Sequence, residues 1–145
     1  MSWGDGNWPE PLLAVIEEFS DVFDAMERYE MLYEFASECD VLNEDRWCEE
    51  TRVHGCQSEA HVLCSLNEDG MFRMIGSADA QIVQGLMAIA QKAVNGLPPD
   101  EVAEFPVTFT RDLGLMDSLS PNRANGFLNM FTRVRQEARK LCEVY

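Results

Sequence analysis

The sequence predicts an α+β fold in which a small antiparallel β-sheet packs against several helices. Amphipathic helical patterns occupy both ends of the 145-residue chain, and a single pair of strand-like segments lies between them. The strand-like pair is joined by an Asp-Gly turn, which is typical of a hairpin. Elements of one kind follow each other instead of alternating, and the length suits one domain over residues 1–145.

The first 52 residues predict two helices and a loop. Residues 9–23 place apolar side chains at helical spacing, and residues 24–38 repeat the pattern after a joint. Asp24 followed three residues later by Glu27 fits a capping box at the start of the second helix. Residues 39–52 have no clean period, so we expect a connecting loop with at most a turn of helix.

The middle of the chain predicts the hairpin. Residues 58–67 alternate between apolar and polar side chains, which indicates a half-buried strand with Cys64 on its apolar face. Asn67 to Gly70 form the turn, and residues 71–75 form the return strand.

Three further helices are expected after the hairpin. The first is capped by Ser77 or Asp79, is the central packing helix, and stops at Asn95-Gly96. A short helix covers residues 98–105, and the last helix begins at Ser120-Pro121.

The charge of the chain excludes several classes of partner. A formal net charge of −15, from 26 acidic and 11 basic residues, repels phosphate backbones and anionic lipids. We therefore expect no nucleic-acid and no membrane partner; the acidic surface serves either solubility or the docking of a basic protein. No basic leader or long apolar run is present, which predicts a cytoplasmic protein.

Among the five cysteines, Cys56 is the candidate for chemistry. It lies in a loop between Gly55 and the polar pair Gln57-Ser58, outside any apolar period. Cys64 and Cys142 fit packing positions, and Cys39 and Cys48 lie in loop territory. The thiol precedes a strand instead of opening a helix, so no helix dipole activates it; this suits sulfur exchange better than hydrolysis.

The polar residues near Cys56 leave alternatives open. His54 is expected to be a solvated loop residue, but a Cys-His hydrolase or transferase using Cys56 with His54 or His61 is the rival class. These residues are too few for a zinc site, so no metal is expected. Asp79 is most simply a helix cap, whereas Arg123 either pairs with a carboxylate or faces a partner.

Three segments resemble the signatures of SufE-type cysteine desulfuration proteins, including the related CsdE group. They are Val53-x-Gly55-Cys56-Gln57-Ser58, then Ala78-Asp79-Ala80-Gln81-Ile82-Val83-Gln84-Gly85-Leu86, and finally Leu119-Ser120-Pro121-Asn122-Arg123-Ala124-Asn125-Gly126. The resemblance covers residues 9–141 and implies a fold akin to that of IscU-type scaffold proteins. Family members often have tryptophan at His61, asparagine at Thr51 and serine at Ala78, so loop support and strand packing differ here.

The resemblance also implies a function. Cys56 would accept persulfide sulfur from a PLP-dependent cysteine desulfurase of the SufS or CsdA type and stimulate that enzyme. It would then deliver the sulfur to an iron-sulfur scaffold of the SufBCD type, without a cofactor of its own. His54, Gly55, Gln57, Ser58, Asp79 and Arg123 match positions of the loop or the partner interface, and the expected state is a monomer or weak homodimer. At rest, we expect the Cys56 loop to shelter its thiol against apolar residues of the hairpin and neighbouring helices.

Overall fold

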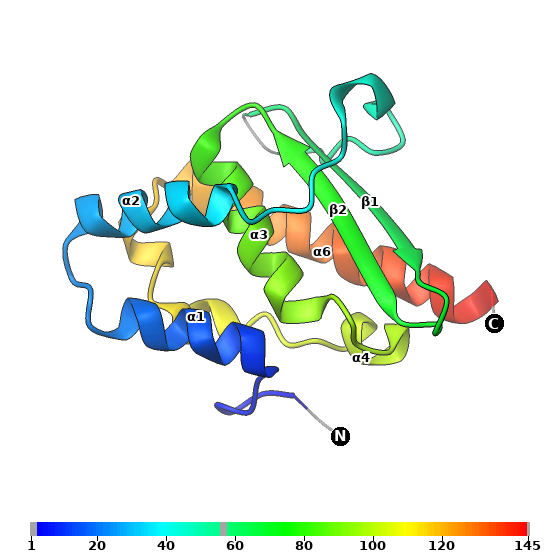
Figure 1. Ribbon diagram of the computed structural model, residues 1–145, viewed down its shortest axis with the longest axis horizontal. Coiled ribbons are helices and arrows are strands. Elements are labelled where there is room, and N and C mark those ends of the chain that lie inside the picture. Colours follow the sequence, from blue (N-terminus) through cyan, green and yellow to red (C-terminus); the bar gives the residue numbers. More distant parts are fainter. Residues whose placement is uncertain (1–2, 56–57, 145) are drawn as a thin grey trace.

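The computed structural model describes residues 3–55 and 58–144 (Figure 1). A two-stranded antiparallel sheet packs against helices, which confirms the predicted α+β class. The elements in chain order are α1 (Glu10–Ser20), α2 (Ala25–Ala36), the 3₁₀ turn η1 (Glu44–Arg46), β1 (Ala60–Leu66), β2 (Phe72–Ala78), α3 (Gln81–Val94), α4 (Pro99–Ala103), α5 (Phe109–Leu113), the 3₁₀ turn η2 (Met116–Ser118) and α6 (Pro121–Val144).

The hairpin sets the register of the sheet. Ala60 pairs with Ala78 at one end and Leu66 with Phe72 at the other. The residues that alternate as apolar in β1 face the helices, and Figure 1 shows α6 crossing behind the hairpin. The return strand predicted over residues 71–75 begins one residue later and ends three residues later in the structure, because β2 continues to Ala78.

The outer edge of β2 is closed by four different partners. Gly76 N–H donates to Asp40 O at 3.1 Å, and Phe72 N–H donates to Leu97 O at 2.8 Å. Between them, Met74 N–H donates to Asn95 Oδ1 at 2.8 Å, so the amide side chain substitutes for a strand. Ala78 N–H donates to Gln84 Oε1 at 2.7 Å, so no described outward-facing N–H of β2 is left unpaired.

Helix α3 is the centre of the core, as predicted. Eleven of its 14 residues are buried, and the surrounding hydrophobic cluster extends along the chain from Trp8 to Ala138. Such a shared core supports the proposal of one domain over residues 1–145. Asn95 ends the helix and Gly96 follows with φ of 92°, as the sequence predicts.

The predicted caps are right for two helices and wrong for α3. Asp24 accepts a hydrogen bond from Met26 N–H at 3.3 Å, and Ser120 Oγ accepts one from Arg123 N–H at 3.3 Å. The N-cap of α3 is instead Ala80, without a side-chain hydrogen bond. Ser77 lies in β2 and donates to Leu42 O, and the Asp79 carboxylate is engaged by Glu59 N–H.

The sequence pattern did not reveal the helical turns between residues 106 and 119. Helix α5 and the turn η2 are too short for a period to be recognised. They are held by aromatic packing, in which the Phe109 ring lies 4.8 Å from that of Phe131 and 5.7 Å from that of Phe105. Trp8 also contacts this cluster, and its indole N–H donates to Asp112 Oδ2 at 2.7 Å.

Gly85 permits the close approach of α2 and α3, and this contact can be tested. A Cβ at this position would overlap the backbone carbonyl of Leu32, which cannot move without shifting α2. We expect Gly85→Ala to lower the free energy of unfolding by about 2 kcal/mol or more, measured by urea denaturation. Gly70→Ala is the matched control: with nothing near its Cβ, it should cost only the roughly 1–2 kcal/mol of its left-handed backbone. Equal losses would contradict the packing argument.

Candidate functional site

A short loop joins two paired segments at one end of the hairpin. Val53 N–H donates to Ala60 O and Val62 N–H donates to Thr51 O, both at 2.8 Å. Arg52 and His61 form an antiparallel bridge between these two bonds. The residues from 54 to 59, which we call the 54–59 loop, are thereby closed at their base like a hairpin connection. Cys56 and Gln57 lie outside the described residues.

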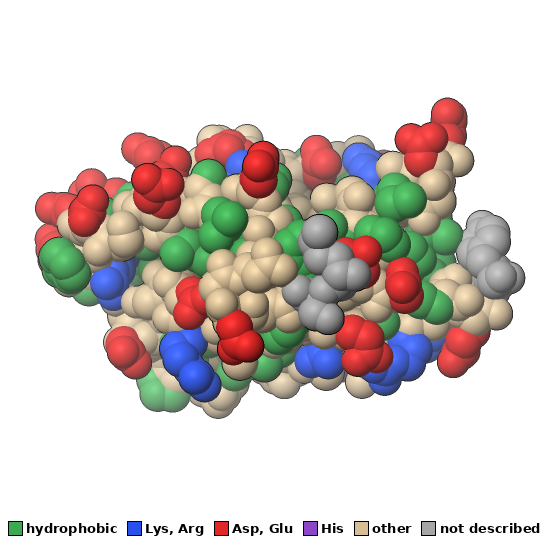
Figure 2. All heavy atoms as spheres, turned by 90° about the horizontal axis from the view of Figure 1, so that it is seen from below, with side chains coloured by type: hydrophobic (Ala, Val, Ile, Leu, Met, Phe, Trp, Pro, Cys, Tyr) green, Lys and Arg blue, Asp and Glu red, His purple; other side chains and the backbone are tan. Residues whose placement is uncertain are grey.

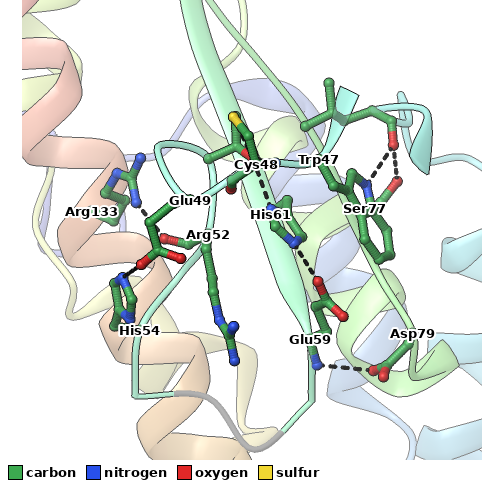
Figure 3. A network of polar contacts seen from close by, with 12 residues as sticks. Trp47, Cys48, Glu49, Arg52, His54, Glu59, His61, Ser77, Asp79 and Arg133 are labelled. Atoms are coloured by element: carbon green, nitrogen blue, oxygen red, sulfur yellow. Dashed lines mark hydrogen bonds and ion pairs between the residues drawn. The ribbon is translucent and has the colours of Figure 1, made fainter. Parts of the chain in front are cut away.

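His61 is the centre of a polar network on one side of the loop base (Figure 3). Its side chain is 3% exposed and stacks on the Trp47 indole, with ring centroids 4.6 Å apart and planes 17° from parallel. His61 Nδ1 lies 2.8 Å from Thr51 Oγ1, and His61 Nε2 lies 2.9 Å from Glu59 Oε2. The ring therefore joins the segment that enters the loop to the segment that leaves it.

The strand alternation suggests a solvent-facing His61, but the structure buries the ring. Trp47 covers the outer face of the sheet, and its indole N–H donates to Leu42 O at 3.1 Å. Burial of imidazole is tolerated because both ring nitrogens have hydrogen-bond partners. This tryptophan comes from the segment 39–52, whose sequence predicts only a loop.

Asp79 fastens the end of the 54–59 loop to the start of α3. Glu59 N–H donates to Asp79 Oδ1 at 3.1 Å, and Asp79 N–H donates to Glu59 O at 3.0 Å. These reciprocal bonds extend the pairing of β1 and β2 by one position beyond Ala60 and Ala78. Asp79 is thus bonded to the backbone at the end of the loop, and it is not the helix cap favoured by local sequence.

Helix α6 fastens the beginning of the loop through Arg133 and Asn129. The Arg133 guanidinium donates to Arg52 O at 2.7 Å and also to Glu50 O. One helical turn away, Asn129 Nδ2 donates to Gly55 O at 3.2 Å. Sequence reasoning missed both residues, although their spacing of four places them on one face of a helix.

Gly55 has a backbone that requires glycine. Its φ is 85°, in the left-handed region, and a Cβ would overlap the Asn129 amide. The chain can therefore pass close to α6 immediately before Cys56 only because this position has no side chain.

A small apolar pocket lies behind the end of the loop. Its volume is about 10 Å³, and it is lined by Ala60 of β1 together with side chains of α3 and α6, including Val83, Phe127, Met130 and Arg123. Arg123 is half-buried in the first turn of α6, and the described residues offer its guanidinium no ion pair. Arg123 is thus separate from the polar network around His61 and contributes to the pocket instead.

A second hollow of about 410 Å³ lies on the other side of the loop. Its lining includes His54, Gly55, Asn129 and Arg133. The His54 side chain is 70% exposed and lies 3.1 Å from Glu49 Oε1, so the prediction of a solvated loop histidine is confirmed. Ser58 is half-buried and precedes Glu59 in the descending limb of the loop.

The described cysteines differ in their surroundings. Burial raises the pKa of the Cys64 thiol to about 12, with the Glu137 carboxylate adding to the effect. Burial and the neighbouring Asp40 raise the pKa of Cys39 to about 11. Cys48 is exposed, and its Sγ lies 3.8 Å from Thr51 Oγ1. Cys64 is therefore a packing residue, as predicted, and its thiol is kept protonated near neutral pH.

The surface is acidic over much of its extent. Figure 2 shows carboxylates spread across one face, with only a few basic side chains between them. Within residues 3–55 and 58–144, no group of three or more His, Cys, Asp or Glu side chains is placed to hold a metal ion. Over the same residues, no helix combines the length and apolar character needed to cross a bilayer.

Comparison with known families covers nearly the whole chain. Residues 13–138 match the family described as "SufE: Fe-S metabolism associated domain". The chain belongs to the SufE family. This confirms the resemblance seen in the three sequence segments and associates the protein with iron-sulfur metabolism and sulfur transfer.

Individual SufE relatives agree with this assignment. An uncharacterized SufE-like protein of Synechocystis sp. is 35% identical over 90% of this chain and 81% of its own length. An uncharacterized SufE-like protein of Rhizobium etli is 31% identical, and the match covers 96% of this chain and 97% of that protein. SufE-like protein 1, chloroplastic/mitochondrial, of Arabidopsis thaliana is 29% identical, and the match covers 90% of this chain but 35% of that protein.

The fold of the SufE chain is also found in a solved structure. The solution structure of a hypothetical protein from Thermus thermophilus superposes with a TM-score of 0.77 at 25% identity. The match covers 94% of this chain and 98% of the other.

The contribution of Arg133 to the loop base can be measured. Arg133→Met keeps much of the aliphatic packing but leaves the carbonyls of Glu50 and Arg52 without their charged donor. We expect a loss of about 2 kcal/mol in the free energy of unfolding. Arg139→Met is the control, because that side chain is 57% exposed and makes only a 3.6 Å ion pair with Glu104. Its effect should stay below about 0.5 kcal/mol, and a similar loss in both variants would count against the anchor.

The cysteine environments predict an order of alkylation. At pH 8, a thiol with a pKa of about 12, such as Cys64, is ionised only to about one part in ten thousand. Iodoacetamide should therefore modify Cys48 at least about tenfold faster than Cys64, as followed by peptide mass spectrometry. The rate at Cys64 should rise with pH toward 12, and in urea the two rates should converge. Equal rates in the folded protein would show that Cys64 is not protected.

Proposed function

We propose that this SufE-family protein accepts sulfur on Cys56 from a PLP-dependent cysteine desulfurase of the SufS or CsdA type. It then hands the sulfur to an iron-sulfur scaffold of the SufBCD type. The observation that carries the proposal is the anchoring of both limbs of the loop that contains Cys56: Gly55 to α6 and Glu59 to Asp79. The family assignment supports the coarse role in iron-sulfur metabolism.

The chemical step is a thiol exchange that needs no external oxidant. The Cys56 thiolate attacks the outer sulfur of the desulfurase persulfide, and a new S–S bond forms as the donor's S–S bond breaks. The desulfurase cysteine leaves as a thiolate, so one sulfur atom is transferred without net oxidation. Docking supplies the proximity that makes this bimolecular exchange fast. Removing the sulfur also frees the desulfurase for its next turnover, which is how the protein would stimulate that enzyme.

The shelter for the transferred sulfur stays part of the proposal, because the pocket behind the loop measures only about 10 Å³ and its walls must move apart to admit a persulfide. Ala60, one of its lining residues, is four positions from Cys56, a stretch of chain that reaches at most about 14 Å. Once the pocket has opened, apolar walls from Val83, Phe127 and Met130 would keep small reductants in water away from the persulfide. We assign Arg123, which also lines this pocket, to the contact with the partner, because the described residues give its guanidinium no counter-ion.

The alternative of a Cys-His hydrolase or transferase receives less support. Both ring nitrogens of His61 are engaged by Thr51 and Glu59, so this ring offers no free nitrogen to act as a general base. His54 is largely exposed beside Glu49. The cytoplasmic location and the monomeric or weakly dimeric state stay predictions.

Sulfur transfer is tested by mass spectrometry. After incubation with a cysteine desulfurase and cysteine, the intact protein should gain the mass of one sulfur atom, and this gain should be lost on reduction. Cys56→Ser should abolish it, whereas Cys48→Ser, which removes the exposed thiol of a neighbouring turn, should retain it. Labelling that survives Cys56→Ser, or that is shared by several cysteines, would rule out a dedicated acceptor.

The role of Arg123 is tested by stimulation of the desulfurase. We expect Arg123→Ala to weaken the stimulation at least about tenfold at limiting protein concentration, because a charged interface contact is lost. Arg111→Ala removes a basic side chain from α5 and is the matched control. Unchanged stimulation by Arg123→Ala would restrict Arg123 to lining the pocket.

A further inference from the structure

One edge of the hairpin is closed and the other is open over part of its length. Gly76, Met74 and Phe72 of β2 donate their N–H groups away from β1. In an antiparallel pair, the residues directly opposite them on β1 also point their backbone groups outward. These partners are Val62, Cys64 and Leu66. Val62 N–H is taken by Thr51 O at 2.8 Å.

The outward backbone groups of Cys64 and Leu66 are left without a hydrogen-bond partner among the described residues. The segment that covers Ala60 and Val62 cannot extend over them, because it turns away before Thr51. Thr51 N–H donates back to Cys48 O at 3.2 Å, and Cys48 N–H donates to Thr51 Oγ1 at 3.1 Å. The second half of β1 therefore presents strand donors and acceptors in register with an existing neighbour.

A groove continues this open edge. It measures about 490 Å³ and lies between the hairpin turn, the start of α4 and the end of α6. These three segments are also close together in Figure 1. Leu66, Pro99 and Leu141 are apolar residues of the groove's lining, and Glu68 and Asp100 are its charged residues.

The charges favour a basic occupant over a second copy of this chain. No basic side chain lines the groove among the described residues. The basic residues near the end of α6 are already paired, Arg139 with Glu104 at 3.6 Å and Lys140 with Glu137 at 3.7 Å. A second copy would bring its own Glu68 and Asp100 to the same place. Each copy has a net charge of −15, so the two copies would repel each other.

We propose that the edge of β1 at Cys64 and Leu66 binds an extended, basic segment of a partner protein as an added strand, with an apolar side chain in the groove. Backbone hydrogen bonds to these two residues supply affinity, and the groove with its two carboxylates supplies specificity. The added strand would lie on the same edge of β1 as the segment from Thr51 to Val53 and would follow it along that edge. The partner protein that carries the added strand would therefore lie beside the 54–59 loop. The inference goes beyond sulfur transfer and holds whether or not Cys56 accepts sulfur.

A short peptide tests this directly on the full chain. The probe is a blocked hexapeptide of alternating lysine and valine, titrated into ¹⁵N-labelled protein. The amide signals of Cys64 and Leu66 should shift, and their hydrogen exchange should slow on binding. A peptide of alternating glutamate and valine should bind at least about tenfold more weakly. Two probes N-methylated on alternate residues should differ, since only one set of amides faces β1.

Charge reversal in the protein completes the test. Glu68→Lys with Asp100→Lys should weaken binding of the lysine peptide about tenfold or more. The control is Glu30→Lys with Glu34→Lys, an equal change of charge on exposed positions of α2, away from the hairpin turn in Figure 1. The proposal is overturned if both double variants bind equally, if the two N-methylated probes bind alike, or if the shifts lie elsewhere. It is also overturned if sedimentation shows that this edge pairs two copies of the chain.

Discussion

The closure of the 54–59 loop depends on two backbone hydrogen bonds, Val53 to Ala60 and Val62 to Thr51. They set the residues of the loop apart from the strands and determine where the chain must turn. The side chains that reinforce this closure all act on its immediate neighbours. His61 joins Thr51 to Glu59, and Asp79 holds the backbone of Glu59. Without the pairing, these contacts would have no fixed geometry to stabilise.

The arrangement meets two demands that the proposed role of a sulfur carrier makes on the loop. A loop that presents a thiol to larger partners needs a backbone free of bulky packing, which Gly55 provides beside α6. Its ends must nevertheless be placed reproducibly, and Arg133 of α6 and Asp79, which lies between β2 and α3, do this from opposite sides. Cys64 lies in the strand that leaves the loop, yet its burial keeps the thiol protonated. Position relative to the loop base, more than residue type, thus separates a reactive candidate from a packing residue.

The sequence alone predicts the structural features that depend on residues close together in the chain. Helical periods, the Asp-Gly turn and the Ser120 cap depend on neighbouring residues, and the structure confirms them. The sequence alone does not predict features that depend on a partner distant along the chain. Strand alternation left His61 on the polar face because nothing local indicates that Trp47 covers it. Asp79 was assigned to the nearest helix end, although Glu59, 20 residues earlier, is its partner. Arg133 has a partner 81 residues away, which only the path of α6 reveals.

Native-state hydrogen exchange tests the closed loop base most directly. The amides of Val53, Val62 and Asp79 donate across it, so their opening should require a large part of the global unfolding free energy, which is about 5–15 kcal/mol for a domain of this kind. The amides of the exposed hairpin turn, such as that of Glu68, provide the fast reference. Protection of all three amides close to that of the α3 core is the result that the account predicts. Exchange at the rate of the turn would contradict it, because the loop would then have no fixed base from which to present Cys56.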